Sequence, residues 1–498
     1  MKVSLRAAIL SLLLPLVSLA QQNPPEAMAE KLYLNGLKLM GEKLYQQAIQ
    51  DFQSLLSSFP QSTYADNALL ELGKYYFRVE RSPQKASEQF ERIIREFQGK
   101  ETAADAYLWK GLVLTESATS EQQLQDGLAN FLRTVQFYPS SPAVEQALYQ
   151  AGITEIRLQH YEPASDYLER CTTDYPLGTA APGAQLALGK AMFFRGRVER
   201  AMLEIQRERD LYPKKSEAAV ALRWNSLLWR LYYQPRVDPA GMFKNQTLAT
   251  IKGTTPVEDC AGLAFDSNQL LYFSDPKAQR IRTIDSDLRV TGGFNAREPA
   301  GIFIDSGGGY YVADSTGIAA RDTFRPLSYL KGTKRESEIV EKARDVFRTS
   351  YGDFYLLEGG DGKVLHYTSS FGFDSVYAPS LDGGVEAMSI DLYDRIALLF
   401  KREKKINIYD RRGKLVVTVA SQGPGYAFQS PSRIRFDAFG HLYVLDKDLH
   451  AVHIFDRDGK LLYQCVVPTM RAPREMAITD SGEIYVWDDK SAGIWVLK

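Results

Sequence analysis

The stretch PAGIFIDSGGGYYVAD, residues 299–314, decides the fold of the C-terminal half, because its pattern occurs there six times in fixed register. A short apolar run ends at an anchor residue, here Asp305, and a second marked residue, here Asp314, follows nine positions later. A tyrosine usually precedes the second mark by three residues. The anchors are Asp266, Asp305, Thr349, Asp391, Asp437 and Thr479, and the second marks are Asp275, Asp314, Glu358, Phe400, Asp446 and Asp488.

The spacing between these copies predicts the fold of this half. Copies about 40 residues apart, each with three or four short strands, are typical of β-propeller blades. Six copies therefore predict a six-bladed β-propeller over residues 247–498. The chain ends on the third strand of the last copy, so that sheet needs an outer strand from elsewhere. We expect the run Thr247–Lys252 to fill it and to close the ring.

The N-terminal half has a helical period and regular breakers between residues 26 and 233. Small residues at fixed points let two helices approach closely, a large apolar residue fills the space between them, and proline ends the second helix. The pattern predicts five helix pairs and a capping helix, Glu217–Tyr233. The best matching copies are Gly36, Ala48, Phe52 and Pro60; Gly152, Ala164, Leu168 and Pro176; and Gly189, Ala201, Ile205 and Pro213.

Both halves resemble known repeat families. The helical landmarks resemble the tetratricopeptide repeat, and exits such as Tyr175-Pro176 resemble the lengthened form of bacterial envelope-assembly proteins. The propeller copies resemble the NHL repeat. The predicted fold class is thus a two-domain chain, α and then all-β, with a tetratricopeptide α-solenoid (26–233), a linker (234–246) and the propeller. Because the linker holds two prolines, we expect the halves to fold separately.

The first twenty residues are predicted to be an export signal. Two basic residues precede an apolar stretch from Ala7 to Val17, and Ser18-Leu19-Ala20 places small residues where a signal peptidase cleaves. An uncleaved helix is the alternative. No cysteine follows, so we expect no lipid anchor, no transmembrane segment after cleavage, and a periplasmic or secreted protein.

Charge and cysteine content limit the function further. The 60 basic and 61 acidic residues balance, which argues against nucleic acid as a partner. Three cysteines are too few for a disulfide framework. Cys171 is expected to be a small buried residue, whereas the sequence does not say whether Cys260 and Cys465 pair.

The first helix of each repeat is expected to line a partner-binding groove. Exposed aromatic side chains with lysines among them suit a protein or peptide partner. For Phe77 and Phe193 the alternative is that each packs into the neighbouring repeat. The predicted groove residues are Tyr33, Asn67, Lys74, Phe77, Tyr149, Lys190 and Phe193.

A second candidate site is the mouth of the propeller channel, where each inner strand begins. Charged residues of both signs meet there, while two blades offer only Ala-Gly. They could form a polar binding mouth, or they could simply pair with one another. The predicted mouth residues are Arg344, Asp345, Glu386, Arg433, Arg474 and Glu475.

The sequence favours an interaction protein over an enzyme. Six-bladed enzymes such as lactonases resembling gluconolactonase hold a metal at the channel with carboxylate, Asn or His ligands, and this mouth lacks Asn and His. We therefore expect no metal, no cofactor and no catalytic residue. The predicted function is an exported, non-catalytic scaffold of the bacterial envelope that binds a partner protein through its helical groove and a second ligand or partner through its propeller face. The alternative is a propeller lactonase or lyase delivered to its site by the repeats.

Overall fold

The structure is a computed structural model that describes residues 24–237, 242–253, 257, 259–305, 307–314, 317–320, 323–326, 328–331, 336–340, 342–378 and 384–498. The predicted export signal lies outside these residues. Two compact units are present. The first comprises the described residues up to Glu116 together with Ala129–Val144, and the second comprises Ser117–Leu128 and the described residues from Glu145 to Lys498.

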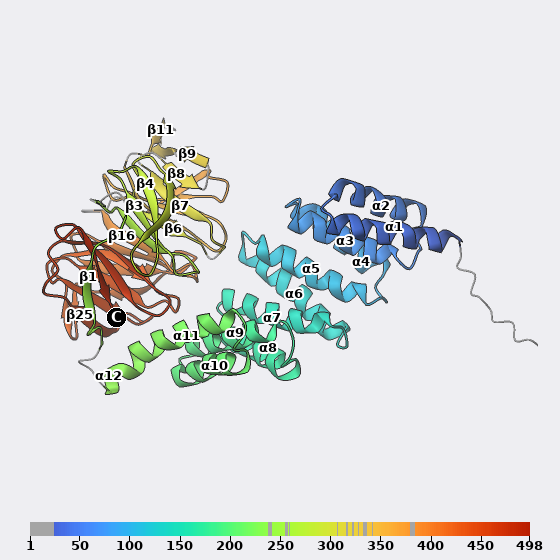
Figure 1. Cartoon of the computed structure of the whole chain (residues 1–498), viewed down its shortest axis with the longest axis horizontal. Coiled ribbons are helices and arrows are strands. Elements are labelled where there is room, and N and C mark those ends of the chain that lie inside the picture. Colours follow the sequence, from blue (N-terminus) through green and yellow to red (C-terminus); the bar gives the residue numbers. More distant parts are fainter. Residues whose placement is uncertain are drawn as a thin grey trace, which may run out of the picture. The chain divides into compact units, whose positions relative to one another are not determined.

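Residues 24–237 are helical (Figure 1), as the periodicity predicts. None of the described helices is both long and apolar enough to cross a lipid bilayer. A π-helical turn, Trp229–Tyr233, joins α11 to α12, so helix continues into the predicted linker. The helices are α1 Pro24–Gly41, α2 Tyr45–Ser58, α3 Ala65–Arg78, α4 Pro83–Glu96, α5 Thr102–Glu116, α6 Glu121–Phe137, α7 Ala143–Arg157, α8 Tyr161–Asp174, α9 Ala181–Phe194, α10 Val198–Leu211, α11 Glu217–Leu228 and α12 Gln234–Val237.

The glycine landmarks act by letting helices pack closely. In the first pair, a Cβ on Gly36 of α1 would lie only 2.5 Å from the Phe52 ring of α2. The same relation recurs between Gly73 and Phe90, where the distance would be 2.4 Å. Each large side chain thus occupies the space that a methyl group would need, as the spacing predicts. Gly152 with Leu168 and Gly189 with Ile205 repeat the arrangement.

The C-terminal part is a six-bladed propeller, which confirms the prediction. Six four-stranded antiparallel sheets follow one another along the chain. Blade 1 holds β2 Gly262–Phe265, β3 Leu271–Asp275, β4 Arg280–Ile284 and β5 Val290–Asn295; blade 2 holds β6 Ile302–Ile304, β7 Tyr310–Asp314, β8 Gly317–Ala320 and β9 Thr323–Pro326; blade 3 holds β12 Ala343–Arg348, β13 Phe354–Glu358, β14 Val364–Tyr367 and β15 Phe373–Ala378.

The remaining blades follow the same order, with two extra hairpins that the repeat pattern does not predict. Blade 4 holds β16 Val385–Ile390, β17 Ile396–Phe400, β18 Lys405–Tyr409 and β19 Leu415–Val419; blade 5 holds β22 Pro431–Phe436, β23 Leu442–Asp446, β24 Ala451–Phe455 and β25 Leu461–Val466; blade 6 holds β26 Pro473–Ile478, β27 Ile484–Asp488, β28 Gly493–Leu497 and β1 Gln246–Ala249. The extra hairpins are β10 Ser328–Lys331 with β11 Glu336–Ile339, and β20 Gln422–Gly423 with β21 Tyr426–Ala427.

The repeated anchors are turn formers. Each anchor oxygen accepts a hydrogen bond from the backbone N–H four residues later, for example Asp391 from Arg395 at 2.9 Å and Thr479 from Glu483 at 3.0 Å. Short polar side chains form such turns because they replace a backbone acceptor. Three of the second marks, Asp275, Asp446 and Asp488, act similarly; Asp488 accepts from the N–H groups of Arg471 at 2.6 Å and Ser491 at 3.1 Å. The anchors and these three aspartates therefore stabilise the turns of the blades.

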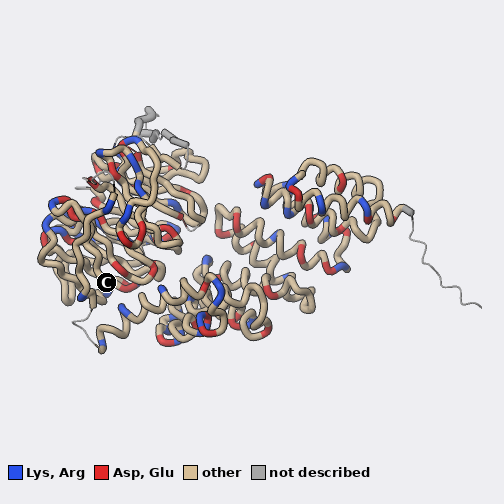
Figure 2. The backbone as a smooth tube through the Cα atoms, viewed as in Figure 1, with Lys and Arg blue, Asp and Glu red and all other residues tan. Residues whose placement is uncertain are grey.

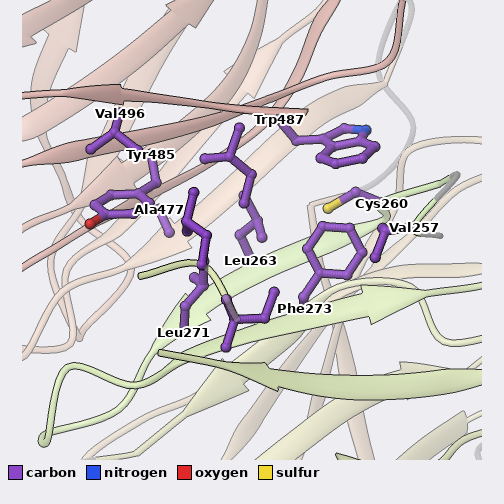
Figure 3. Close-up of a cluster of buried hydrophobic side chains, with 12 residues drawn as sticks. Val257, Cys260, Leu263, Leu271, Phe273, Ala477, Tyr485, Trp487 and Val496 are labelled. Carbon is purple, nitrogen blue, oxygen red and sulfur yellow. The ribbon is translucent and has the colours of Figure 1, made fainter. Parts of the chain in front are cut away.

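The ring closes between the two ends of the propeller, as predicted. β1 pairs antiparallel with β28, with Thr247 opposite Val496. The strand begins at Gln246 and ends at Ala249, and the chain then crosses to blade 1 through a bridge between Lys252 and Arg289. Figure 3 shows the buried cluster where blade 6 meets blade 1, in which the rings of Phe273 and Trp487 lie 5.2 Å apart.

We expect Thr247→Pro to destabilise the propeller and Leu248→Pro to serve as its matched control. The Lys498 N–H donates to the Asn245 carbonyl. Because N–H groups along an antiparallel strand point alternately toward and away from the neighbouring strand, the Thr247 N–H points toward β28 and the Leu248 N–H points away from it. Proline at 247 removes a ladder hydrogen bond at the closure, whereas an edge strand tolerates proline at an outward N–H. Thermal melts should show a loss of several degrees for Thr247→Pro alone. Equal melts for the two variants would contradict the closure.

Candidate functional site

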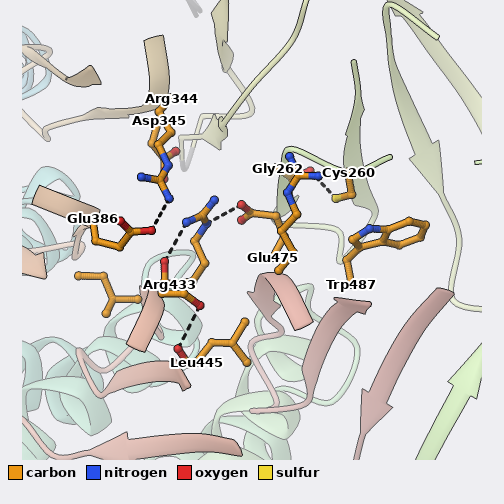
Figure 4. A network of polar contacts seen from close by, with 12 residues as sticks. Cys260, Gly262, Arg344, Asp345, Glu386, Arg433, Leu445, Glu475 and Trp487 are labelled. Carbon is orange, nitrogen blue, oxygen red and sulfur yellow. Dashed lines mark hydrogen bonds and ion pairs between the residues drawn. The ribbon is translucent and has the colours of Figure 1, made fainter. Parts of the chain in front are cut away.

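The predicted mouth residues form ion pairs between neighbouring blades (Figure 4). Arg344 of blade 3 donates from Nη2 to Oε1 of Glu386 in blade 4 at 2.8 Å. Arg433 of blade 5 donates from Nε to Oε1 of Glu475 in blade 6. Although burial alone would raise the pKa of Glu386, the Arg344 charge and hydrogen bond hold it below its usual value. The structure therefore brings four of the six predicted residues together as two cross-blade pairs.

The other two predicted residues have partners of their own. Arg474 donates from Nη1 to Asp259 at 2.6 Å, beside the start of blade 1. Asp345 is buried, and burial raises its pKa although Arg435 opposes the shift. The mouth charges thus pair with one another and with neighbours, which is the second of the two arrangements that the sequence leaves open.

Arg435 is the central residue that the sequence interpretation missed. Its guanidinium extends from blade 5 to Oδ2 of Asp345 in blade 3 at 3.3 Å and to Oε2 of Glu475 in blade 6 at 3.7 Å. The residue is only 9% exposed, and Nη1 also donates to the Ile434 carbonyl at 3.0 Å. Residues two apart on a strand share a face, so Arg433 could have indicated Arg435. Arg435 of blade 5 therefore links blades 3 and 6 inside the channel.

In blades 1 and 2 the positions equivalent to the mouth charges hold Ala-Gly, and their backbone packs directly against the neighbouring strand. A Cβ on Gly301 would lie 2.7 Å from the Asp345 Cα and 2.8 Å from the Arg344 carbonyl oxygen. On Gly262 it would lie 2.8 Å from the Ala300 carbonyl oxygen. The Ala-Gly pairs therefore let the first three inner strands approach more closely than any side chain would permit.

A cavity of about 210 Å³ occupies the channel beyond Arg435. Its lining combines residues from the ends of all six inner strands with the guanidinium of Arg435. Four phenylalanines from different blades supply the apolar part, and the wall near them carries acidic and hydroxyl groups. These are Phe265, Phe303, Phe347 and Phe436, with Ser389, Asp391, Asp437, Thr479 and Asp480. Ligand pockets of drug-sized molecules are usually larger, about 300 Å³ or more.

Four of the predicted groove residues lie in the first compact unit. Tyr33 packs between the rings of Phe52 and Tyr64, and Asn67 is half-buried on α3. Lys74 is paired with Glu71 at 2.8 Å and lies 5.7 Å from the centre of the Trp109 ring. Phe77 is buried, as the alternative interpretation expects.

The other three predicted groove residues lie in the second unit. Tyr149 lies against Gly183, and burial raises its pKa. Lys190 is half-buried, and burial lowers its pKa to about 8. Phe193 is buried, with its ring 4.8 Å from that of Phe439 in the propeller. Propeller residues, and not only a neighbouring repeat, therefore cover this part of the predicted groove.

The three cysteines all lie among the residues that the structure describes. Cys171, Cys260 and Cys465 are free thiols and buried, as expected for Cys171, and burial raises the pKa of Cys171 to about 12. His450 lies in the turn before β24. Across the described ranges no three His, Cys, Asp or Glu side chains gather in a way that could hold a metal ion.

Fold and sites together define a two-part repeat protein, with paired helices followed by a propeller whose inner strands are linked by ion pairs. Residues 25–147 and 142–229 match a model of the family YfiO, described as an outer membrane lipoprotein. The helical part of the chain is therefore a YfiO-type, tetratricopeptide-like array. No curated protein matches the sequence.

Several solved structures resemble about half of the chain at low identity. The virginiamycin B lyase of Staphylococcus aureus is 12% identical, covering 49% of this chain and 82% of its own, with a TM-score of 0.38. A gluconolactonase of Xanthomonas campestris is 13% identical over 52% of this chain and 91% of its own, with a TM-score of 0.41. Regucalcin of Agrobacterium tumefaciens, a calcium-binding protein, is 13% identical over 50% and 93%, with a TM-score of 0.36. These similarities are too distant to bear on activity.

Proposed function

We propose that the protein is a scaffold of the bacterial envelope that binds a partner protein through the first repeats of its helical array. The location is supported by the match to an outer membrane lipoprotein family, and the export signal expected at residues 1–20 agrees with it. Basic and acidic residues are interspersed along the described backbone of the array and the propeller (Figure 2), which argues against a polyanion as the partner. A protein partner is the class that suits such a surface.

The observation that carries the proposal is a cation–aromatic patch in the first unit. The Trp109 ring on α5 is half-buried, and two cations of α3 lie over it, Lys74 at 5.7 Å and Arg78 at 5.3 Å from its centre. Two hydrogen bonds to Glu116, at 2.6 and 2.9 Å, hold Arg78 in place. Trp and Arg are the residues that most often dominate binding energy at interfaces. We call Lys74, Arg78, Trp109 and Glu116 the Trp109 patch.

The chemistry of the patch favours an acidic segment or a C-terminal carboxylate of the partner. The guanidinium of Arg78 is preorganised, and the Lys74 side chain, 31% exposed, can turn from Glu71 toward a stronger acceptor. A partner carboxylate would contact both cations while an apolar side chain covers the indole. The propeller face would hold a second ligand or partner at the mouth around Arg344 and Glu386.

We expect Lys74→Ala combined with Arg78→Ala to weaken partner binding by roughly 30-fold or more, because both cations over the indole are lost. Partners captured from envelope extract would be identified by mass spectrometry, and dissociation constants measured by calorimetry with the purified partner. Lys85→Ala with Arg92→Ala is the matched control, since both residues lie on α4 and form surface ion pairs. Thermal melts should be alike for both pairs.

A variant of the propeller mouth separates this proposal from the enzymatic alternative. Arg344→Ala with Glu386→Ala should leave partner binding unchanged. If this variant loses the partner while the Trp109 patch variant keeps it, the proposed site is wrong. Hydrolysis of a lactone by the purified protein, abolished by the mouth variant, would favour a propeller lactonase instead.

A further inference from the structure

The hairpin tips of three consecutive blades carry an aromatic residue where a polar one is usual. The position two residues after each anchor lies at the tip of the turn between the first two strands. Turn tips face water and favour Gly, Asn, Asp and Ser. In blades 3, 4 and 5 the position holds Tyr351, Tyr393 and Phe439, whereas in blades 1, 2 and 6 it holds Asn268, Gly307 and Ser481.

The Phe439 tip is enclosed by helices of the array. It is 0% exposed, and its ring centre lies 4.8 Å from that of Phe193 on α9 and 5.3 Å from that of Trp224 on α11. The neighbouring His441 is equally buried and shares a 2.8 Å hydrogen bond through Nε2 with the Tyr232 hydroxyl. An apolar contact and a buried polar contact thus join the same two parts of the chain.

The Tyr393 tip makes a second contact with α9. Its ring lies 4.5 Å from that of Phe194, and the guanidinium of Arg457 lies 4.4 Å from the same phenylalanine ring. The ammonium of Lys190 lies 5.3 Å from the Tyr393 ring and 4.7 Å from the Trp224 ring. Lys190 therefore inserts between an aromatic side chain of the propeller and one of the array, where cation–π attraction offsets part of its lost hydration.

The Tyr351 tip of blade 3 contacts the array at a third place. It packs against Ala118, Leu124 and Leu158, which form a small buried cluster. Beside it, Arg411 donates to the Tyr351 hydroxyl at 3.0 Å and pairs with Glu121 at 2.8 Å. The contact combines apolar burial with a charge pair, as in stable protein interfaces.

Blade 6 contacts the array at Gly482, where the lack of a side chain allows a close approach. A Cβ on Gly482 would lie 2.7 Å from the Leu227 side chain of α11. The Gly482 carbonyl accepts a hydrogen bond from Arg230 at 3.3 Å, and Asp480 pairs with Arg223 at 3.5 Å. The helix surface and the four tips are therefore complementary in shape and in charge.

We propose that the tips of blades 3 to 6 are an internal docking surface, and that the propeller occupies in cis the part of the helical groove formed by α9 and α11. Lys190 and Phe193 then bind the chain's own propeller and no foreign partner. Partner binding is left to the first repeats, a consequence that rests on the proposed function. Residues 145–233 belong with the propeller in one body, so separate folding of the two halves, as the sequence suggests, would fail for the last repeats.

Cleavage of the folded full-length protein tests the docking without any partner. A site-specific protease sequence placed within residues 238–241 allows the chain to be cut between α12 and β1. We expect the two fragments to elute together on gel filtration at micromolar concentration, even in 1 M NaCl. Aromatic contacts supply most of the binding energy of this surface, and salt screens only its charge pairs. Tyr393→Ala with Phe439→Ala should release them, because each ring is worth roughly 30-fold in affinity.

Two controls test whether the aromatic tips hold the fragments together. Asn268→Ala with Gly307→Ala, at the tips of blades 1 and 2, should leave the fragments together. In the uncut aromatic variant, amide hydrogen exchange should quicken in α9 and α11 and stay unchanged in α1–α4. Separation of the wild-type fragments, or equal exchange in α9 and α11, would overturn the proposal. Tighter partner binding by the aromatic variant would show that the propeller competes with the partner, and would overturn the assignment of separate sites.

Discussion

Arg435→Ala is expected to lower the stability of the propeller by about 3–5 kcal/mol, the usual cost of breaking a buried ion pair by removing one partner. Asp345 would remain 5% exposed without the guanidinium that lies 3.3 Å from it, whereas Glu475 would keep Arg433. For a domain of this size the loss corresponds to a fall of about 6–20 °C in Tm. Calorimetry at pH 7 measures it.

Two further variants identify the cause of that loss. Arg344→Ala also removes an arginine from an ion pair, but this pair is partly exposed, with side chains 29% and 14% accessible, so the cost should stay near 1 kcal/mol. Arg435→Met with Asp345→Asn removes both buried charges and should recover most of the stability. If the double variant is as unstable as Arg435→Ala, lost packing and not an uncompensated charge explains the effect.

The pH dependence follows from the sign of the Asp345 shift. Burial already raises the pKa of Asp345, and loss of Arg435 would raise it further. A carboxyl group whose pKa is higher in the folded than in the unfolded state binds more protons when folded, so acidification favours the folded state. The stability deficit of Arg435→Ala relative to the wild type should therefore shrink as the pH falls below 7.

Gly301→Ala is expected to cost about 3 kcal/mol although it adds a single methyl group. The new Cβ would lie 2.7 Å from the Asp345 Cα and 2.8 Å from the Arg344 carbonyl oxygen, and these backbone atoms cannot turn aside as a side chain can. Blades 2 and 3 would have to separate, and overpacking of this kind costs about 1–3 kcal/mol or more. Urea unfolding measures the loss.

Gly360→Ala is the matched control for this effect. No heavy atom lies within 4 Å of a Cβ at Gly360, so the same change should be close to neutral there. Equal destabilisation by the two variants would mean that backbone flexibility, and not the contact between blades 2 and 3, explains the loss.

The architecture could be predicted because both halves repeat. A repeated unit presents the same packing problem each time, so the residues that solve it recur at fixed spacing, as Gly36 with Phe52 and Asp391 with its turn demonstrate. Local hydrogen bonds of the anchors, the number of blades and the closing strand all follow from short-range chemistry or from a missing edge. These features were therefore visible in one sequence.

The positions of side chains relative to distant parts of the chain could not be predicted in this way. Arg435 contacts Asp345, 90 residues earlier, and Phe439 contacts Phe193, 246 positions earlier by the numbering; neither pair has a spacing that repeats. The sequence interpretation placed Lys190 and Phe193 in an open groove because helical register assigns a face and not what covers that face.

The sequence by itself determined the class of each half, the six blades, the order of the strands and the residues that form the turns, because periodic patterns report local geometry. Only the tertiary structure decided that the charges of the channel mouth pair across blades, that Arg435 links three blades inside the channel, and that aromatic tips of the propeller meet α9 and α11. Those outcomes depend on which non-repeating side chains the folded chain brings within contact distance, and burial then fixes their energetic weight.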